Sequence, residues 1–214
     1  AESSHWRWVV FAKAMQDWQA EQRKLRVAGR LSIVLASGGD LDTTNESVQA
    51  LLDGADVDDL EIVLMDHGTG LGKATAFLRR WAGHPNVVYR RLSRSYHHAG
   101  NRTLGFLEST GEHVLFLNPE VAMRQGGLRV LIDRLADPEV LGVQPLILTA
   151  QATVYSAGKI WLAPNFLPAD FLQDLPGADA RCARELRSPA LCGAAMMLRA
   201  ADVVAAQGFD PRYV

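Results

Sequence analysis

The sequence predicts an α/β domain with a mostly parallel sheet flanked by helices, preceded by an appended helix at the N-terminus. Three observations support this fold class. From Gly29 onward, short apolar runs alternate with longer segments of helical periodicity. The chain has 214 residues, of which 48% are hydrophobic, so one domain can bury a sizeable core. Polar residues follow three of the apolar runs, as is usual where ligands bind beyond the carboxyl ends of parallel strands.

The N-terminal segment has the pattern of an amphipathic helix. Its apolar stripe consists of Trp8, Phe11, Met15, Trp18 and Leu25. Their spacings of three, four, three and seven residues place them on one side of a helix. We expect this side to pack on the protein itself; the alternative is that the stripe contacts a membrane surface or a partner protein. Residues 1–29 are therefore assigned to this helix and its linker, and residues 30–214 to the main domain.

Four strands are predicted from short, mostly apolar runs. They are Leu31–Ala36, Glu61–Met65, Asn86–Arg90 and His113–Leu117, and a further apolar run covers Val140–Leu148. Near-continuous apolar runs are typical of strands that are buried on both faces of a parallel sheet.

Helices are predicted between these strands. The first begins at a cap residue that is Asp42, Thr43 or Thr44, and it ends at Leu52. The second follows the turn after Met65 and ends at Trp81. Two more span about residues 99–110 and 126–136, and the pair Asp137-Pro138 stops the last of them.

Composition and charge exclude several classes of function. The 22 Lys and Arg residues against 24 Asp and Glu residues give a net charge of −2, without the basic excess of a nucleic-acid-binding protein. An anionic ligand must therefore be held by a local device. Cys182 and Cys192 lack the spacing of a disulfide framework or a metal site, so we expect free thiols and a cytoplasmic location. The uncharged run Ala190–Leu198 is too short to cross a bilayer.

The glycine-rich stretch Gly68–Thr75 does not fit either common phosphate-binding motif. A Walker A loop needs glycine at the position of His67 and Ser or Thr at the position of Ala74. The dinucleotide fingerprint needs its third glycine at Lys73. The neighbouring pair His97-His98 has no further ligand at short spacing, so it does not indicate a metal site.

Three strand ends carry the candidate binding residues. They are Ser37 after the first strand, Asp66-His67 after the second, and Asn118-Pro119-Glu120 after the fourth. A carboxylate at such an end can accept hydrogen bonds from a base or a ribose, or can hold a divalent cation that binds phosphates. Each residue could instead cap a helix or solvate a loop, but their joint placement favours a ligand site.

The order of five stretches resembles the family 2 glycosyltransferases, which have the Rossmann-like GT-A fold, and in particular their rhamnosyltransferase-like branch. The stretches are LSIVLAS (31–37), EIVLMDHGT (61–69), AGNRTLGFLESTGEHVLFLNPEV (99–121), VYSAGKIW (154–161) and LCGAAMMLRAADVVAAQGFDPRY (191–213). They cover roughly residues 31–214, and the ordered set is more specific than any single stretch.

The resemblance implies a site for a nucleotide-diphosphate sugar. It assigns Ser37, Asp66 and His67 to the nucleotide pocket, with Asp66 as the residue that binds the base. Asn118-Pro119-Glu120 takes the place of the family's DxD-type motif, and Glu120 is the expected ligand of Mg²⁺ or Mn²⁺. Asn101 and Arg102 are expected to face the ribose, sugar or phosphates, with helix capping as the alternative for Asn101.

The sequence departs from the family pattern at several positions. His67 replaces an acidic or amide residue, Glu120 replaces Asp, and the first strand lacks the aromatic that covers the base. The family's general base follows its GFD element, and the sequence ends at Val214 before that residue. We expect Asp210 to anchor its loop and not to act as the base.

Two functions remain open from the sequence. The first is a glycosyltransferase that transfers a sugar to a glycan or small-molecule acceptor with the help of a metal ion, and that is joined to further domains. The second is a non-catalytic domain of the same fold that serves as a scaffold or nucleotide-sugar-binding module. The expected location is cytoplasmic, with a membrane-peripheral alternative through the N-terminal stripe.

Overall fold

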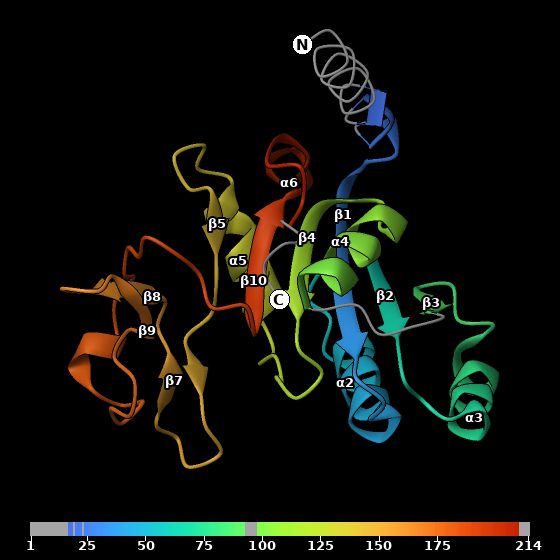
Figure 1. Cartoon of the computed structure of the whole chain (residues 1–214), viewed down its shortest axis with the longest axis horizontal. Helices are drawn as coiled ribbons and strands as arrows, with labels where there is room; N and C mark the ends of the chain where they lie inside the picture. Colours follow the sequence, from blue (N-terminus) through green and yellow to red (C-terminus); the bar gives the residue numbers. More distant parts are fainter. Residues whose placement is uncertain (1–16, 19, 23, 93–97, 210–214) are drawn as a thin grey trace, which may run out of the picture.

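A computed structural model of the chain describes residues 17, 18, 20–22, 24–92 and 98–209 (Figure 1). Its centre is a six-stranded sheet with the order β3-β2-β1-β4-β10-β5. The strands are β1 (Val27–Ser37), β2 (Leu60–Asp66), β3 (Val87–Arg91), β4 (Gly111–Leu117), β5 (Gly142–Val143) and β10 (Ala195–Arg199). Strands β1 to β4 are parallel, and β10 runs antiparallel to both β4 and β5. The predicted α/β class with a mostly parallel sheet is therefore confirmed.

Helices cover both faces of the sheet. On one face lie α2 (Leu41–Asp53), α3 (Leu71–Trp81) and α5 (Gly127–Leu135), and on the other lie α4 (His98–Glu108) and α6 (Ala200–Ala205). Alternate side chains of β1 face opposite layers of helices. Ile33 and Leu35 belong to the core on the first face, and Val34 belongs to the core on the second face. The sheet is thus buried on both sides, as its near-continuous apolar strands predict.

Two small antiparallel pairs extend the molecule beyond β5. The strands β6 (Ile147–Leu148) and β7 (Val154–Ser156) form one pair, and β8 (Lys159–Leu162) and β9 (Leu167–Asp170) form a hairpin. A short 3₁₀ helix, Ala180–Cys182, lies in the segment that returns to β10. Figure 1 shows these elements to one side of the main sheet.

Two predicted boundaries are wrong, and hydrogen bonds explain both. The cap of α2 is Asp40 rather than Asp42, Thr43 or Thr44, because its Oδ1 accepts hydrogen bonds from the amides of Asp42 (3.1 Å) and Thr43 (3.2 Å). Strand β1 begins at Val27, within the segment assigned to the N-terminal helix and linker, because the Val27 amide donates to Thr110 O at 2.8 Å.

The N-terminal stripe is described only in part. Trp8, Phe11 and Met15 lie outside the described residues. Trp18 is half-buried and packs against the core that contains Val34 and Phe106. For Trp18, the expected packing on the protein itself is therefore confirmed, whereas Leu25 is exposed.

Both cysteines are free, as predicted, with Cys192 buried and Cys182 partly so. Within the described part of the chain, no helix is both long enough and apolar enough to span a membrane.

The contact between α4 and the sheet depends on a glycine. An added Cβ at Gly105 would overlap Val34 Cγ1 and come within 3.2 Å of Met65 Cγ. We predict that Gly105→Ala lowers the free energy of unfolding by about 1–3 kcal/mol, because the core is already filled. Gly72→Ala is the matched control, since an added Cβ there meets nothing within 4 Å and lies in a helix. The control should be neutral or stabilising by up to about 1 kcal/mol in urea unfolding. Equal effects of the two variants would contradict the packing argument.

Candidate functional site

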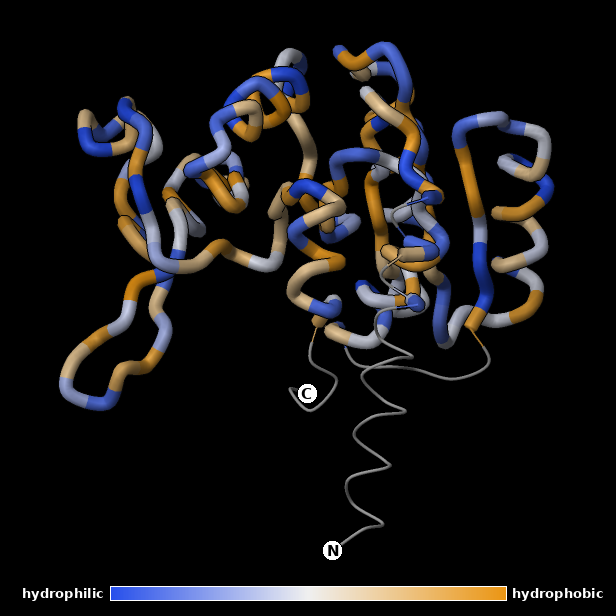
Figure 2. Tube along the Cα trace, turned by 90° about the horizontal axis from the view of Figure 1, so that it is seen from above, coloured by the Kyte–Doolittle hydropathy of each residue, from blue (hydrophilic) through white to orange (hydrophobic). Residues whose placement is uncertain are grey.

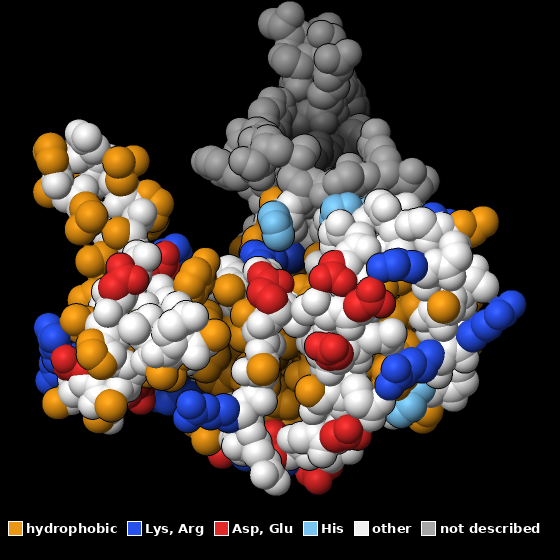
Figure 3. Space-filling model, turned by 90° about the horizontal axis from the view of Figure 1, so that it is seen from below, with side chains coloured by type: hydrophobic (Ala, Val, Ile, Leu, Met, Phe, Trp, Pro, Cys, Tyr) orange, Lys and Arg blue, Asp and Glu red, His pale blue; other side chains and the backbone are white. Residues whose placement is uncertain are grey.

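The carboxyl ends of β1, β2 and β4 meet at one edge of the sheet. Ser37 pairs in register with Asp66, and Leu35 pairs with Leu117, the residue before Asn118. The sheet order places β1 between β2 and β4, so the direction in which successive strands are added reverses here. Open α/β sheets bind ligands beyond such a reversal. Figure 3 looks onto this edge and shows several Asp and Glu side chains gathered along it.

Asp66 is completely buried and hydrogen-bonded on both carboxylate oxygens. Thr69 Oγ1 donates to Oδ1, and Tyr89 OH donates to Oδ2 at 2.6 Å. Arg91 closes the turn by donating to Thr69 O at 2.9 Å. Burial, followed by the bond to Asp66, raises the pKa of Tyr89 well above its usual value. In this state Asp66 holds the turn after β2 and presents no free carboxylate to the surface.

His67 directly follows Asp66 in this turn and is half-buried. Its amide donates to Ser37 O at 3.2 Å, which joins the ends of β1 and β2. A Cβ added to Gly38 would lie 3.9 Å from His67 Cε1, so the imidazole rests beside the turn after β1. Ser37 itself is buried, and its hydroxyl donates to Asp40 O at 3.4 Å.

Arg102 links α4 to two other elements at the same edge. Its Nη2 donates to Gly193 O and, at 3.3 Å, to Asn118 Oδ1. An added Cβ at Gly193 would lie 2.7 Å from Arg102 Nη1, so a side chain there would force the guanidinium to shift. Burial lowers the pKa of the Arg102 guanidinium below its usual value. Among the described residues, no carboxylate forms an ion pair with Arg102, and its guanidinium carbon lies 6.0 Å from the centre of the Phe209 ring.

Asn101 precedes Arg102 and is buried in α4. It is the fourth residue of the helix, so it does not cap the helix start. Within the described ranges, its Oδ1 has no hydrogen-bond donor. Buried amide oxygens are normally paired, so this atom has an unused acceptor position among the described residues.

Glu120 has an exposed carboxylate just beyond β4. Its Oε1 accepts a hydrogen bond from Asn118 Nδ2 at 2.8 Å. No group of three or more His, Cys, Asp or Glu residues that could enclose a metal exists in the part of the chain described. One free carboxylate nevertheless fits Mg²⁺ or Mn²⁺, since such ions often bind through one or two carboxylates and the phosphates of a ligand.

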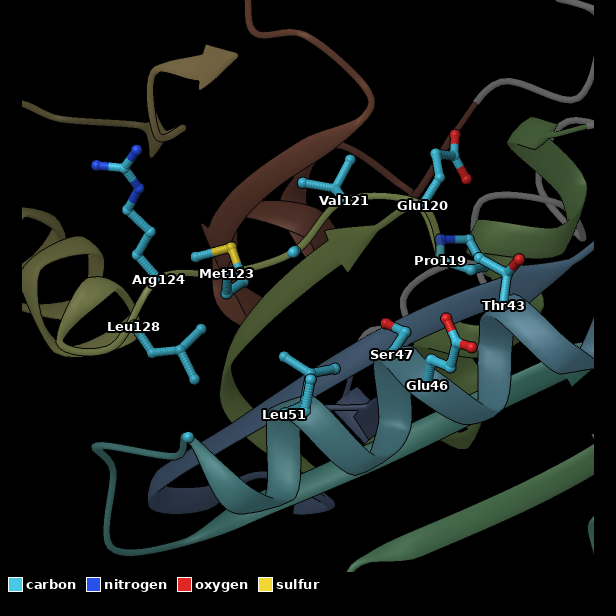
Figure 4. A pocket seen from close by; sticks show the side chains of 13 residues that line it. Thr43, Glu46, Ser47, Leu51, Pro119, Glu120, Val121, Met123, Arg124 and Leu128 are labelled. Carbon is cyan, nitrogen blue, oxygen red and sulfur yellow. The ribbon is translucent and has the colours of Figure 1, made fainter. Parts of the chain in front are cut away.

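A pocket of about 210 Å³ lies between α2 and the loop that follows β4 (Figure 4). Its lining includes Thr43, Glu46, Ser47, Leu51, Glu120, Met123, Arg124 and Leu128. In Figure 4 the Glu120 side chain points away from the aliphatic floor formed by Leu51 and Leu128. The pocket is on the α2 side of the sheet, and Arg102 comes from α4 on the other side, so residues 118–120 lie between them.

The predicted site residues therefore separate into two groups. Arg102, Asn118 and Glu120 form a connected hydrogen-bonded set, and Ser37, Asp66 and His67 hold the ends of β1 and β2 together. The sequence reasoning missed Thr69, Tyr89 and Gly193. The signals available were a threonine three residues after Asp66, which favours a local turn bond, and a glycine before an apolar strand.

Two sequence comparisons relate this chain to known proteins. The model of the family described as glycosyl transferase family 2 matches residues 32–203. No curated protein sequence matches the chain.

Three solved structures illustrate the similarity in fold. A mannosyltransferase from Pyrobaculum calidifontis, in complex with GDP-Man and Mn²⁺, has a TM-score of 0.62 at 15% identity, covering 94% of this chain and 56% of its own. TarS (residues 1–349) from S. aureus has a TM-score of 0.58 at 12% identity, covering 85% and 50%. GalNAc-T7 with UDP, GalNAc and Mn²⁺ has a TM-score of 0.62 at 18% identity, covering 85% and 37%. The chain thus spans about half or less of these proteins, and the similarity shows the predicted GT-A fold.

The bond between Tyr89 and Asp66 gives a stability prediction. Tyr89→Phe removes a donor from a buried carboxylate, so we expect a loss of about 1.5–3 kcal/mol in the free energy of unfolding at neutral pH. Tyr155→Phe is the control, because Tyr155 is exposed and should change stability by less than about 0.5 kcal/mol.

The pH dependence of the Tyr89→Phe effect follows from the raised pKa of Tyr89 in the folded state. The stabilisation by Tyr89 should be constant below the pKa of an unfolded tyrosine, about 10, and should decrease at higher pH. Urea unfolding of the wild type and of Tyr89→Phe, at pH values below and above ~10, measures this stabilisation. A wild-type advantage that grows above pH ~10 would contradict the assignment.

Proposed function

Because the chain belongs to the glycosyl transferase family 2, we propose that it binds a nucleotide-diphosphate sugar and transfers the sugar to a glycan or small-molecule acceptor with the help of a divalent metal ion. The family and the similar folds indicate glycosyl transfer in general terms. The donor, the metal and the acceptor class are the proposed part.

One observation supports the donor site: among the described residues, the half-buried Arg102 guanidinium at the ligand-binding edge has only neutral hydrogen-bond acceptors. Arg102 donates to a backbone carbonyl and to an amide oxygen, and within the described ranges it has no carboxylate partner. A desolvated cation without a counter-charge gains from a bound anion. A diphosphate supplies that anion beside Asn118 and Glu120.

The acidity of this edge supports a role for a metal ion. Asp40, Glu46 and Glu120 are exposed on the loops and helix that surround the strand ends, whereas the nearby Asp42 is paired with Lys73. These carboxylates would repel a diphosphate that arrived without a cation. Glu120 would hold Mg²⁺ or Mn²⁺, and the ion would stabilise the charge of the leaving nucleoside diphosphate. Two of the similar structures hold Mn²⁺ together with a nucleotide or nucleotide sugar, which supports this proposal.

At the other end of the site, Ser37, Asp66 and His67 would form the nucleotide pocket, with His67 facing the base and the buried Ser37 and Asp66 behind it. The two ring nitrogens of His67 can form hydrogen bonds with a base. Asp66 would act from behind the surface, because its bonds to Thr69 and Tyr89 fix the turn on which His67 stands. Asn101 Oδ1, which has no hydrogen-bond partner among the described residues, would accept a hydrogen bond from a hydroxyl of the nucleotide sugar.

The buried state of Asp66 also favours a second candidate function. A residue that the resemblance assigns to base binding is here enclosed by protein contacts, as would be expected of a fold kept as a non-catalytic nucleotide-sugar-binding module. The two functions differ in turnover, not in donor binding. Release of nucleoside diphosphate from bound donor, with or without acceptor, separates them.

Calorimetric titration tests the donor site. GDP, UDP and their sugars are titrated into the protein with and without Mn²⁺. At least one nucleotide should bind the wild type in a Mn²⁺-dependent manner, and Glu120→Ala should weaken that binding by about tenfold or more, since a charged ligand contact is lost. Glu120 is exposed, so Glu120→Ala removes no buried packing.

Glu46→Ala is the matched control for this titration, because Glu46 is an exposed carboxylate on the same edge. It should retain metal-dependent binding if Glu120 holds the ion specifically. Equal losses in both variants would mean that only the general negative charge matters. Failure of every nucleotide to bind the wild type with Mn²⁺ would overturn the donor site.

A further inference from the structure

The β8–β9 hairpin ends in an apolar tip that no described part of the chain covers. Trp161–Pro168 are eight consecutive exposed residues, and seven of them are apolar. Trp161 and Leu162 are each 50% exposed, Leu167 is 62% exposed and Phe166 is 73% exposed. Contiguous apolar surface of this kind marks a site of interaction.

The tip projects from the body of the molecule as a convex knob. Figure 2 shows the hairpin as a loop that stands away from the sheet, and Figure 3 shows its hydrophobic side chains on a separate protrusion. The strand register pairs Leu162 with Leu167 and Trp161 with Pro168. Cross-strand partners share a face and neighbouring pairs alternate, so both faces of the ribbon are apolar.

The base of the hairpin is firmly held. Lys159 Nζ forms an ion pair with Asp170 Oδ2 at 2.7 Å. The Lys159 amide donates to Ser188 Oγ at 2.9 Å and to Ala190 O at 2.8 Å. Lys159 and Asp170 are the nearest charged residues on either side of the tip, and the ten residues between them, 160–169, are uncharged. The hairpin therefore presents an uncharged wedge on an anchored base.

We propose that this tip, defined as Trp161–Pro168, inserts into the interfacial layer of a lipid bilayer. Interfacial insertion needs an uncharged apolar protrusion with aromatic side chains, and Trp161 and Phe166 supply them. One exposed basic residue also stands next to its base, because Arg187 directly precedes Ser188, which bonds to Lys159. Its charge is complementary to anionic lipid headgroups.

A second copy of the chain fits the tip less well. A stable protein interface uses about 20–30 residues on each side, and the tip offers eight. A knob also needs a receiving groove. The pocket beside Glu120 is a poor match, because its lining includes the carboxylates of Glu46 and Glu120. The bilayer is therefore the occupant that the size, shape and charge of the tip favour.

Vesicle flotation tests the proposal with the whole chain. The wild-type protein should float with vesicles of phosphatidylcholine that contain phosphatidylglycerol. The fraction of the double variant Phe166→Asp/Leu167→Asp recovered with the vesicles should be lower by about tenfold or more, because two apolar side chains no longer gain free energy by leaving water. The control is Leu71→Asp/Val130→Asp, which places the same charges at two exposed apolar positions on α3 and α5. This control should float like the wild type.

A probe on the tip identifies the inserting element. Asn165→Cys in a Cys182→Ser background carries an environment-sensitive fluorophore, with Gln125→Cys as the exposed control. Vesicles should shift the emission of the tip label to the blue and leave the control label unchanged.

The proposal is overturned if the wild type does not float, or if both double variants float equally. It is also overturned if the tip variant instead dissociates an oligomer in sedimentation. None of these readouts depends on nucleotide binding, so this proposal and the proposed function can fail separately.

Discussion

The contact between the Arg102 guanidinium and the Gly193 carbonyl organises the candidate site. It joins α4 to the segment before β10, and the same guanidinium reaches Asn118 at the end of β4. These segments lie far apart in the sequence, and a side chain at residue 193 would displace the guanidinium from its present position. Both hydrogen-bond acceptors of the guanidinium are neutral, and no carboxylate among the described residues pairs with it. The proposed donor site rests on this cation at the edge where the parallel strands end.

The fold was largely predictable, since apolar runs such as LSIVLA and EIVLM indicate buried parallel strands by themselves. The strand ends Ser37, Asp66 and Asn118 were also found, because parallel strands bring their carboxyl ends together. The Thr69–Asp66–Tyr89 network was not, because the register of β2 against β3 decides which side chain reaches Asp66. Gly193 was missed for a similar reason: its necessity comes from a guanidinium about ninety residues away. The apolar stretch WLAPNFLP gave no sign that it would lie outside the core.

The site combines a rigid part and an accessible part. Asp66 and Ser37 are buried, and their hydrogen bonds hold the ends of β1 and β2. Glu120 is exposed, and its carboxylate is bound only at one oxygen by Asn118 among the described residues. Buried polar groups of the first kind position a site, whereas exposed carboxylates of the second kind are free to meet a ligand. The chemistry proposed for this chain therefore rests on residues 102 and 118–120.

The most direct test of this account is the paramagnetic broadening of backbone amide signals by Mn²⁺ in the presence of GDP or UDP. Glu120 and the neighbouring end of β4 should lose the most intensity. Gly111, at the start of the same strand, should lose the least intensity. It lies about 20 Å from Leu117, at the far end of the seven-residue strand. Broadening that is strongest near Gly111, or that is uniform over the sheet, would contradict a metal-assisted donor site at the carboxyl edge.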